Sequence, residues 1–122
     1  MYEIVLALTS LFSVVMIVCG LLFIFKPPKK VNYILGYRTT MSMKNQETWD
    51  YAHQYSGKVW LITGIITALV AFPLVIALKT LEIYEILMII LIVLESIAFL
   101  LMIPLTEIAL RKRFDKNGIL KK

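Results

Sequence analysis

The sequence predicts an all-α integral membrane protein: a bundle of three transmembrane helices with a cytoplasmic loop and a helix extension. Of its 122 residues, 60% are hydrophobic, whereas a soluble domain has about 45–50% apolar residues. The excess falls into three apolar runs, each long enough to cross a bilayer, which takes about 20 helical residues. Basic residues flank these runs, so the net charge of +5 indicates membrane topology and not nucleic-acid binding. We therefore expect a single membrane domain over residues 1–122.

Residues 4–25 form the first predicted span, because they contain no charged side chain and would extend about 33 Å as a helix. The K-P-P-K-K segment at residues 26–30 ends this span, since prolines cannot continue a helix and lysines favour headgroup water. Cys19, the single cysteine, lies inside the span, and we interpret it as a small apolar filler.

Residues 26–58 form the only long polar stretch of the sequence, and we call them the motif region. Gly36 indicates a turn or a close backbone approach. Asn45 is expected to cap a helix, because Glu47 and Asp50 follow in the first turn, where carboxylates complement the helix dipole. The motif region is therefore predicted to be a loop that leads into a helix.

That helix is predicted to continue into the second span, at residues 59–78. A helix over residues 45–78 would be about 51 Å long, which exceeds the hydrocarbon core of about 30 Å. Its first three turns should therefore extend beyond the membrane, with Gly57 as a hinge and Pro73 as a kink in the distal part.

Aromatic residues are frequent in the extension. The side chains of Trp49, His53, Ser56 and Trp60 share one helix face, because they recur at i, i+4, i+7 and i+11. We interpret the aromatic residues of the extension as a belt at the headgroup level, with a groove for a peptide or partner as the alternative. These aromatic residues are Trp49, Tyr51, Tyr55 and Trp60.

Residues 86–110 form the third predicted span, and Glu95 lies near its middle. An ionised side chain there costs about 2.5–3.5 kcal/mol on insertion scales, so Glu95 should face protein or water. It is either a functional acid or the acceptor of a structural hydrogen bond from Thr63, Thr67 or Ser96. A contact between subunits of a homo-oligomer is a third interpretation.

The distribution of basic residues predicts the orientation. Of the thirteen lysine and arginine residues, all except Lys79 lie in the motif region or in a basic tail at residues 111–122. Because positive residues stay in the cytoplasm, the N-terminus is predicted outside, and the motif region and the C-terminus inside. The tail is expected to bind the anionic lipids of the bilayer, and docking of a cytoplasmic partner is the alternative.

A spaced set of polar, glycine and aromatic residues precedes the second span. The set comprises Asn32, Gly36, Tyr37, Arg38, Thr39, Ser42, Asn45, Trp49, His53 and Gly57. On these residues the sequence resembles the SdpI family of bacterial membrane proteins, in a short, three-span form. The resemblance implies a multi-pass protein of the bacterial plasma membrane that gives immunity to a secreted antimicrobial peptide toxin. The namesake, with six spans, is also described as a receptor that draws a repressor to the membrane.

Two further side chains of the motif region allow alternative interpretations. Arg38 either lies among lipid phosphates or folds back to form a bidentate pair with Glu107, or less readily with Glu95. His53 is the only histidine, and no second ligand lies at metal-binding spacing, so we expect no metal. We interpret it as a packing or surface residue, with pH sensing as the alternative.

Catalytic motifs are missing from the sequence. It has no glycine-rich phosphate loop, no nucleophile elbow and no acid–base pair at catalytic spacing. We therefore expect no enzyme activity, no cofactor and no nucleic-acid partner. The favoured function is immunity to a membrane-active peptide. The alternatives are a small oligomeric transporter or channel that uses Glu95, and a membrane adaptor that sequesters a cytoplasmic repressor.

Overall fold

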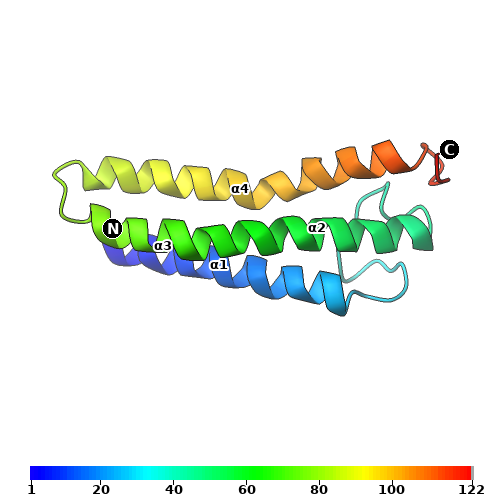
Figure 1. Cartoon of the computed structure of the whole chain (residues 1–122), viewed down its shortest axis with the longest axis horizontal. Helices are drawn as coiled ribbons and strands as arrows, with labels where there is room; N and C mark the ends of the chain where they lie inside the picture. Colours follow the sequence, from blue (N-terminus) through cyan, green and yellow to red (C-terminus); the bar gives the residue numbers. More distant parts are fainter. Residues whose placement is uncertain (122) are drawn as a thin grey trace.

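The computed structural model describes residues 1–121, in which three long helical rods lie side by side (Figure 1). All three are long and apolar enough to cross a membrane, and each predicted span lies inside one of them. The all-α prediction is therefore confirmed. The elements are α1 (Tyr2–Phe25), α2 (Gln46–Ile66), the π-helical η1 (Thr67–Ala71), α3 (Phe72–Leu78) and α4 (Tyr84–Arg113), of which α2, η1 and α3 form one continuous rod.

The long second rod begins where the sequence predicts, after Asn45. The Asn45 side chain accepts a hydrogen bond from the backbone N–H of Thr48 at 2.9 Å. In return, the Thr48 hydroxyl accepts the backbone N–H of Asn45 at 3.0 Å. This reciprocal capping box satisfies two donors that a helix start otherwise leaves free. The cap fixes the first residue of the extension, and the rod continues to Leu78.

Pro73 changes the local helix type of this rod, whereas Gly57 leaves the α-helix regular. Pro73 has no N–H to donate to the preceding turn, and the chain accommodates the loss in the wider π-helical turn Thr67–Ala71. The predicted hinge at Gly57 is wrong, because Gly57 lies within regular α2 and faces Gly20 of α1. A Cβ on either glycine would lie 2.8 Å from the carbonyl oxygen of the other, so both are needed for close helix packing.

The apolar interior is divided into two clusters at opposite ends of the bundle. One contains Val5, Val75 and Met88, near the connection between α3 and α4. The other packs the connection between α1 and α2 against α2 and α4, and comprises Tyr37, Met41, Ala52, Met102, Leu110 and Phe114. The second cluster fixes the motif region to the helices.

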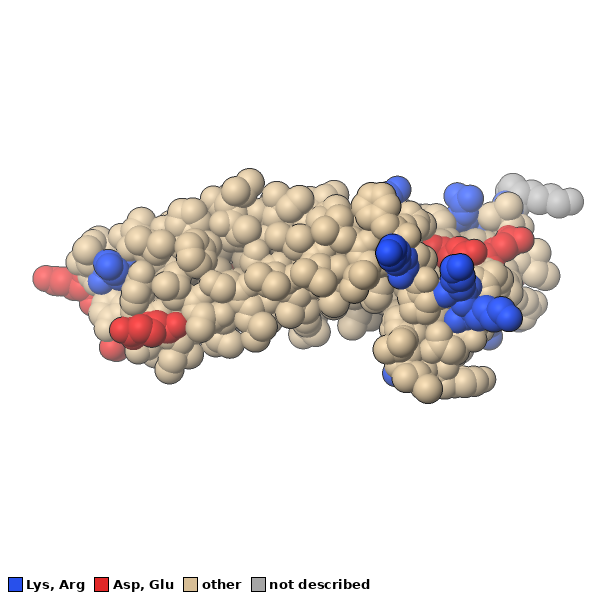
Figure 2. Space-filling model, turned by 90° about the horizontal axis from the view of Figure 1, so that it is seen from below, with Lys and Arg blue, Asp and Glu red and all other residues tan. Residues whose placement is uncertain are grey.

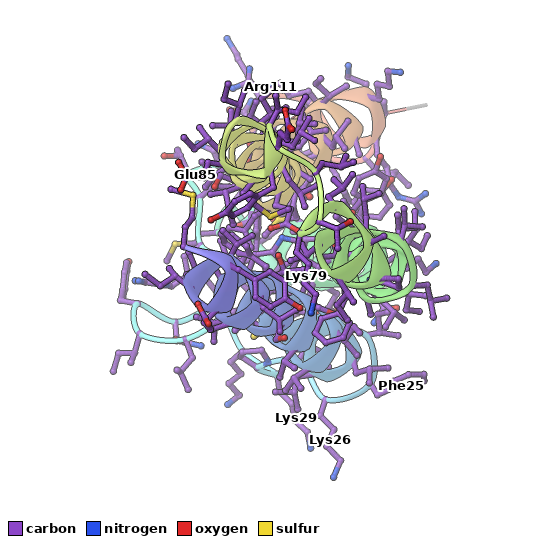
Figure 3. The ribbon with its side chains drawn as sticks, turned by 90° about the vertical axis from the view of Figure 1, so that its left-hand side faces the viewer. Phe25, Lys26, Lys29, Lys79, Glu85 and Arg111 are labelled. Atoms are coloured by element: carbon purple, nitrogen blue, oxygen red, sulfur yellow. The ribbon has the colours of Figure 1, made fainter. Side chains whose placement is uncertain are left out.

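Charge is segregated along the bundle. Lysine and arginine gather at one end in the space-filling view (Figure 2), where the C-terminus also lies in Figure 1. At the opposite end acidic residues predominate, and Figure 3 labels Lys79 and Glu85 there. We call the end that contains the connection at residues 26–45 and the tail the basic end, and we call that connection the motif loop.

Candidate functional site

The motif loop folds back on the first turns of α2, and Trp49 holds its beginning. The Trp49 side chain is fully buried, and its Nε1–H donates a hydrogen bond to the carbonyl of Pro28 at 2.6 Å. Its ring also lies 4.4 Å from that of His53. The predicted headgroup-belt role is therefore wrong for Trp49, because the loop covers its face of the helix.

Trp60 is partly buried and packs against α4, and the belt role stays a prediction for it. Its Nε1–H donates to the carbonyl of Phe99 at 3.0 Å, and the two rings lie 5.0 Å apart. Trp60 thus connects α2 to α4. Tyr51 and Tyr55 remain half-buried near the surface, with their rings 6.2 Å apart.

His53 is the anchor for the middle of the loop. The backbone N–H of Tyr37 donates to Nε2 of His53 at 3.0 Å, and Nδ1 of His53 lies 2.8 Å from the carbonyl of Trp49. An N–H group can only donate, so Nε2 is the acceptor and Nδ1 carries the proton that it donates to Trp49. The imidazole is fully buried and packs edge-on against Phe23 of α1 at 4.9 Å. His53 is therefore a neutral packing residue, one of the two roles that we expected.

Gly36 allows the loop to approach this imidazole. Its φ of +104° lies in the region that residues with a side chain rarely adopt. A Cβ at this position would also lie 2.5 Å from Nε2 of His53 and 3.1 Å from Cγ of Pro28. The predicted turn with close backbone approach is thus observed, and it explains a glycine one residue before Tyr37.

Tyr37 connects the loop to α4. Its hydroxyl lies 2.9 Å from Oε1 of Glu107, to which it donates, and 3.2 Å from the carbonyl oxygen of Ile103. Burial, together with the neighbouring carboxylate of Glu107, raises the pKa of Tyr37 well above the ordinary value for tyrosine. The hydroxyl therefore keeps its proton and acts as a donor.

Arg38 does not form the bidentate pair that we considered. Its side chain is exposed, and Nη1 donates to the carbonyl of Tyr33 within the same loop. Glu107 is contacted by Tyr37 instead, and Glu95 lies deep in the bundle. The backbone turn at Gly36 directs Tyr37 inward, which leaves the next side chain on the outside.

The second half of the loop is closed by hydroxyl groups. The Ser42 hydroxyl donates to the carbonyl of Tyr37 at 3.0 Å, and it accepts the backbone N–H of Thr39 at 2.8 Å. The Thr39 hydroxyl accepts the N–H of Ser42 in return at 3.1 Å. Asn45, besides capping α2, donates through Nδ2 to the carbonyl of Gly118 at 2.7 Å. These contacts join the motif loop to the tail.

The first half of the loop is organised by Asn32. Its Oδ1 accepts the backbone N–H groups of Ile34 at 2.9 Å and Leu35 at 2.8 Å. This is a side-chain turn typical of asparagine. The structure therefore brings most of the predicted site residues into one network at the start of α2. Gly57 lies apart from it, at the contact between α1 and α2.

Glu95 belongs to a separate site inside the bundle. Its carboxylate is buried, and the hydroxyl of Thr9 lies 3.0 Å from each of its oxygens. A structural hydrogen bond was one of the expected roles, but the donor is on α1, whereas Ser96 and Thr67 bond to carbonyls of their own helices.

The contact with Thr9 was missed, although the sequence contains a signal for it. Thr9, Ser13, Met16 and Gly20 recur at i, i+4, i+7 and i+11, and all four are buried. Three of these four, Thr9, Ser13 and Gly20, are small or hydroxyl residues, and such residues on one side of a span mark the face that packs on other helices. On that face, Ser13 donates to the carbonyl of Gly64 at 3.1 Å.

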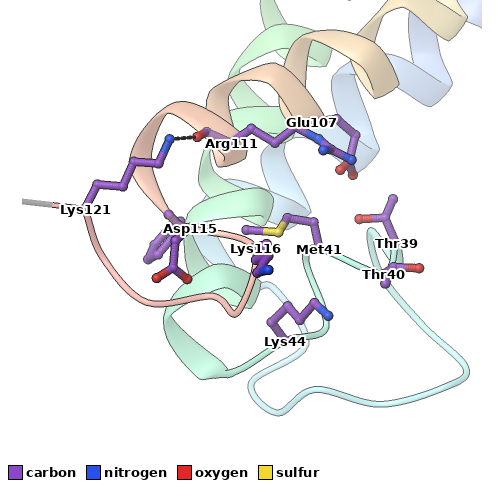
Figure 4. A pocket seen from close by; sticks show the side chains of 10 residues that line it. Thr39, Thr40, Met41, Lys44, Glu107, Arg111, Asp115, Lys116 and Lys121 are labelled. Atoms are coloured by element: carbon purple, nitrogen blue, oxygen red, sulfur yellow. Dashed lines mark hydrogen bonds between the residues drawn. The ribbon is translucent and has the colours of Figure 1, made fainter.

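An open pocket of about 700 Å³ lies at the basic end, between the motif loop and the tail (Figure 4). Figure 4 shows Met41 and Lys44 of the loop gathered with Lys116 of the tail, and Arg111 of α4 on the other side of Met41. The residues that line it are Thr39, Thr40, Met41, Lys44, Glu107, Arg111, Phe114, Asp115, Lys116 and Lys121. Basic side chains outnumber acidic ones in this lining, so the pocket favours an anionic group.

Comparison with known proteins gives a consistent result. A profile described as the SdpI/YfhL protein family matches residues 29–105, well over half of the chain. An uncharacterized protein, YfhL of Bacillus subtilis (strain 168), is 40% identical over 53 residues, which are 43% of this chain and 48% of YfhL. The matched segment thus spans about half the length of that relative. No solved structure matches the chain.

The family match includes the motif loop from Lys29 onwards and the α2 face that holds it, together with most of α4. The three helices that are long and apolar enough to span a membrane agree with the resemblance that the sequence shows, as does the G-Y-R-T loop that is bonded to α2 and α4. The chain belongs to the SdpI/YfhL family of multi-pass membrane proteins.

Proposed function

We propose that this protein makes the cell that carries it resistant to a secreted, membrane-active antimicrobial peptide. The observation that carries the proposal is the family match over residues 29–105, which contain the network at the start of α2. We place the basic end in the cytoplasm of a bacterial plasma membrane, because lysine and arginine are retained on that side.

The outer surface of the bundle supports a direct role inside the bilayer. Large apolar side chains point outward along the spans, for example Leu11 and Val18 on α1 and Leu69 on the second rod. A helical peptide that enters the bilayer can pack on such a surface, since helices in lipid associate through close side-chain contact. A toxin bound in this way is withheld from assembling into a pore.

The motif loop has a supporting role in this mechanism. Tyr37, Trp49 and His53 are buried and bonded within the protein, so they hold the ends of α1, α2 and α4 in a fixed arrangement. Arg38 is the member of the G-Y-R-T segment whose long side chain is exposed. We infer that it contacts lipid phosphate or the peptide, to which a guanidinium group binds well.

The test is a deletion strain that is complemented with variants and exposed to a panel of secreted membrane-active peptides. Loss of the gene should lower the inhibitory concentration of at least one peptide and accelerate the collapse of the membrane potential that the peptide causes. Arg38→Ala should restore less resistance than the control Lys58→Ala, which removes an exposed cation of α2 outside the motif loop. A deletion strain as resistant as its parent to every peptide would refute the proposal.

A second candidate function, recruitment of a cytoplasmic regulator, is favoured by the pocket at the basic end. Its basic lining suits an acidic segment of a partner protein. Lys44→Glu combined with Lys116→Glu should then abolish the transcriptional response to the toxin while peptide resistance persists. A response that is unchanged in this double variant would exclude the pocket as a docking site.

A further inference from the structure

Three consecutive large apolar side chains stand out from the motif loop. Tyr33 is 84% exposed, Ile34 81% and Leu35 65%. Three such neighbours in water would be unfavourable, because each retains most of its apolar surface outside the protein. The segment therefore needs an occupant that covers it.

This segment has a defined shape. The side chain of Asn32 accepts the backbone N–H groups of Ile34 and Leu35, and Arg38 donates to the carbonyl of Tyr33. Local side-chain bonds thus satisfy two N–H groups and one carbonyl of the turn. Groups that are already bonded can enter a less polar environment at lower cost.

The contacts of the next two residues define the depth of the segment. Gly36 and Tyr37 lie against His53, whose ring packs on Phe23 in the last turn of α1. The following residue of α2, Gln54, donates to the carbonyl of Ile24 at 2.7 Å. The loop therefore returns from Pro28 to the level at which the apolar helix α1 ends. The end of an apolar span is where hydrocarbon is expected to give way to headgroups.

The segment at residues 33–35 belongs to a connection that projects laterally from the helix bundle. Figure 3, viewed along the bundle, shows the cyan connection between α1 and α2 extending laterally past α1. Figure 2 shows a lobe standing out from the side of the molecule at the basic end. A segment that projects laterally at this depth meets the headgroup region of the lipids that surround α1.

Charge beside the segment matches an anionic lipid surface. Lys29, Lys30 and Arg38 are exposed on either side of the apolar residues. Basic side chains next to exposed apolar ones are typical of segments that lie in the membrane interface, where phosphates meet the cations and acyl chains meet the apolar groups.

We propose that Tyr33-Ile34-Leu35 is a wedge that inserts into the leaflet at the basic end, with Lys29, Lys30 and Arg38 bound to anionic headgroups. The wedge anchors the loop to lipid on one side, while Tyr37 anchors it to α4 on the other. Its occupant is the bilayer, so the proposal does not depend on resistance to a toxin.

Fluorescence quenching tests the wedge directly. In a Cys19→Ala background, Ile34→Cys is labelled with an environment-sensitive fluorophore, and the full chain is reconstituted in vesicles of phosphatidylcholine and phosphatidylglycerol. Lipids with a nitroxide near the acyl carbonyl should quench the label severalfold more than a water-soluble quencher does. The matched control is Asn117→Cys, an exposed position in the tail, where the water-soluble quencher should dominate.

Two further measurements separate insertion from other outcomes. Adding Tyr33→Asp and Leu35→Asp to the labelled chain should transfer the label to water, while unchanged slow hydrogen exchange of the buried Tyr37 amide, which donates to His53, shows that the loop is still folded. Replacing phosphatidylglycerol with phosphatidylcholine should reduce the lipid quenching. Equal quenching at positions 34 and 117 would overturn the proposal. Efficient crosslinking of two copies through the thiol of the unlabelled Ile34→Cys chain, together with absent lipid quenching of the labelled chain, would also overturn it.

Discussion

The backbone N–H of Tyr37 and Nε2 of His53 form a buried hydrogen bond of 3.0 Å between residues that are sixteen positions apart in the sequence. The bond requires a neutral imidazole whose proton lies on Nδ1, and the carbonyl of Trp49 accepts that proton at 2.8 Å. One side chain of α2 therefore determines where the G-Y-R-T segment is placed, and several of our predictions depend on this bond.

His53→Phe should detach the middle of the motif loop. The substitution keeps an aromatic ring against Phe23 but leaves the buried N–H of Tyr37 without an acceptor, which costs about 1–3 kcal/mol. Thermal unfolding in detergent should show the loss, and the amide of Tyr37 should exchange its hydrogen faster. Asp50→Asn, an exposed change on the same helix, is the control and should leave both measurements unchanged.

Gly36→Ala should destabilise the same contact by a different route. A Cβ would meet Nε2 of His53 at 2.5 Å, and the φ of +104° adds about 1–2 kcal/mol for a residue with a side chain. We expect a lower unfolding temperature together with greater protease sensitivity of the loop. Thr40→Ala, at an exposed position of the loop, should behave like the parent. Equal stability of the two variants would contradict the observed turn.

Tyr37→Phe should lower the free energy of unfolding by about 1.5–3 kcal/mol, the contribution of a hydrogen bond to a charged acceptor. Glu107→Gln should show a partly overlapping loss, so the double variant should lose less than the sum of the single variants. Denaturant titration of the four proteins measures this coupling. Strict additivity would indicate that the two side chains do not interact.

Alkaline pH should act on the same pair. The folded state raises the pKa of Tyr37 above the ordinary value of 10.0, because burial and the carboxylate of Glu107 disfavour the phenolate. The contribution of Tyr37 to stability is therefore complete below pH 10 and is lost as the pH rises above that value. The stability difference between the parent and Tyr37→Phe should shrink over this range. A difference that stays constant would mean that Tyr37 titrates normally in the folded protein.

Thr9→Val should weaken the association of α1 with α4. It removes the hydroxyl that lies 3.0 Å from both oxygens of Glu95, and hydrogen bonds between membrane helices contribute about 0.6 kcal/mol on average and at most about 1.7. Ser10→Ala is the matched control, since Ser10 donates only to the carbonyl of Leu6 in its own helix. Unfolding in mixed micelles should separate the two variants. A larger loss for Ser10→Ala would argue against the contact with Glu95.

Local signals in the sequence were sufficient for the helices and their limits. The apolar runs predicted the three rods, and Asn45 with its following turn predicted where α2 starts, because capping depends on residues three positions apart. The glycine at position 36 predicted a close approach, but its partner, His53, lies on another element and was not identified. One interpretation of the sequence was that Arg38 reaches Glu107, but the structure shows that Tyr37 does so. The backbone turn before these two neighbours decides which of them points inward, and that turn depends on contacts with another element.

By itself, the sequence determined the number and extent of the apolar helices, the accumulation of basic residues at one end, and the family to which the chain belongs. These properties depend on composition and on spacing along the chain. The tertiary structure alone decided that Trp49 and His53 are buried beneath the loop, that Thr9 is the partner of Glu95, and that Gly57 packs on Gly20. Each of these contacts joins residues on different elements, and only the packing of the helices brings them within bonding distance.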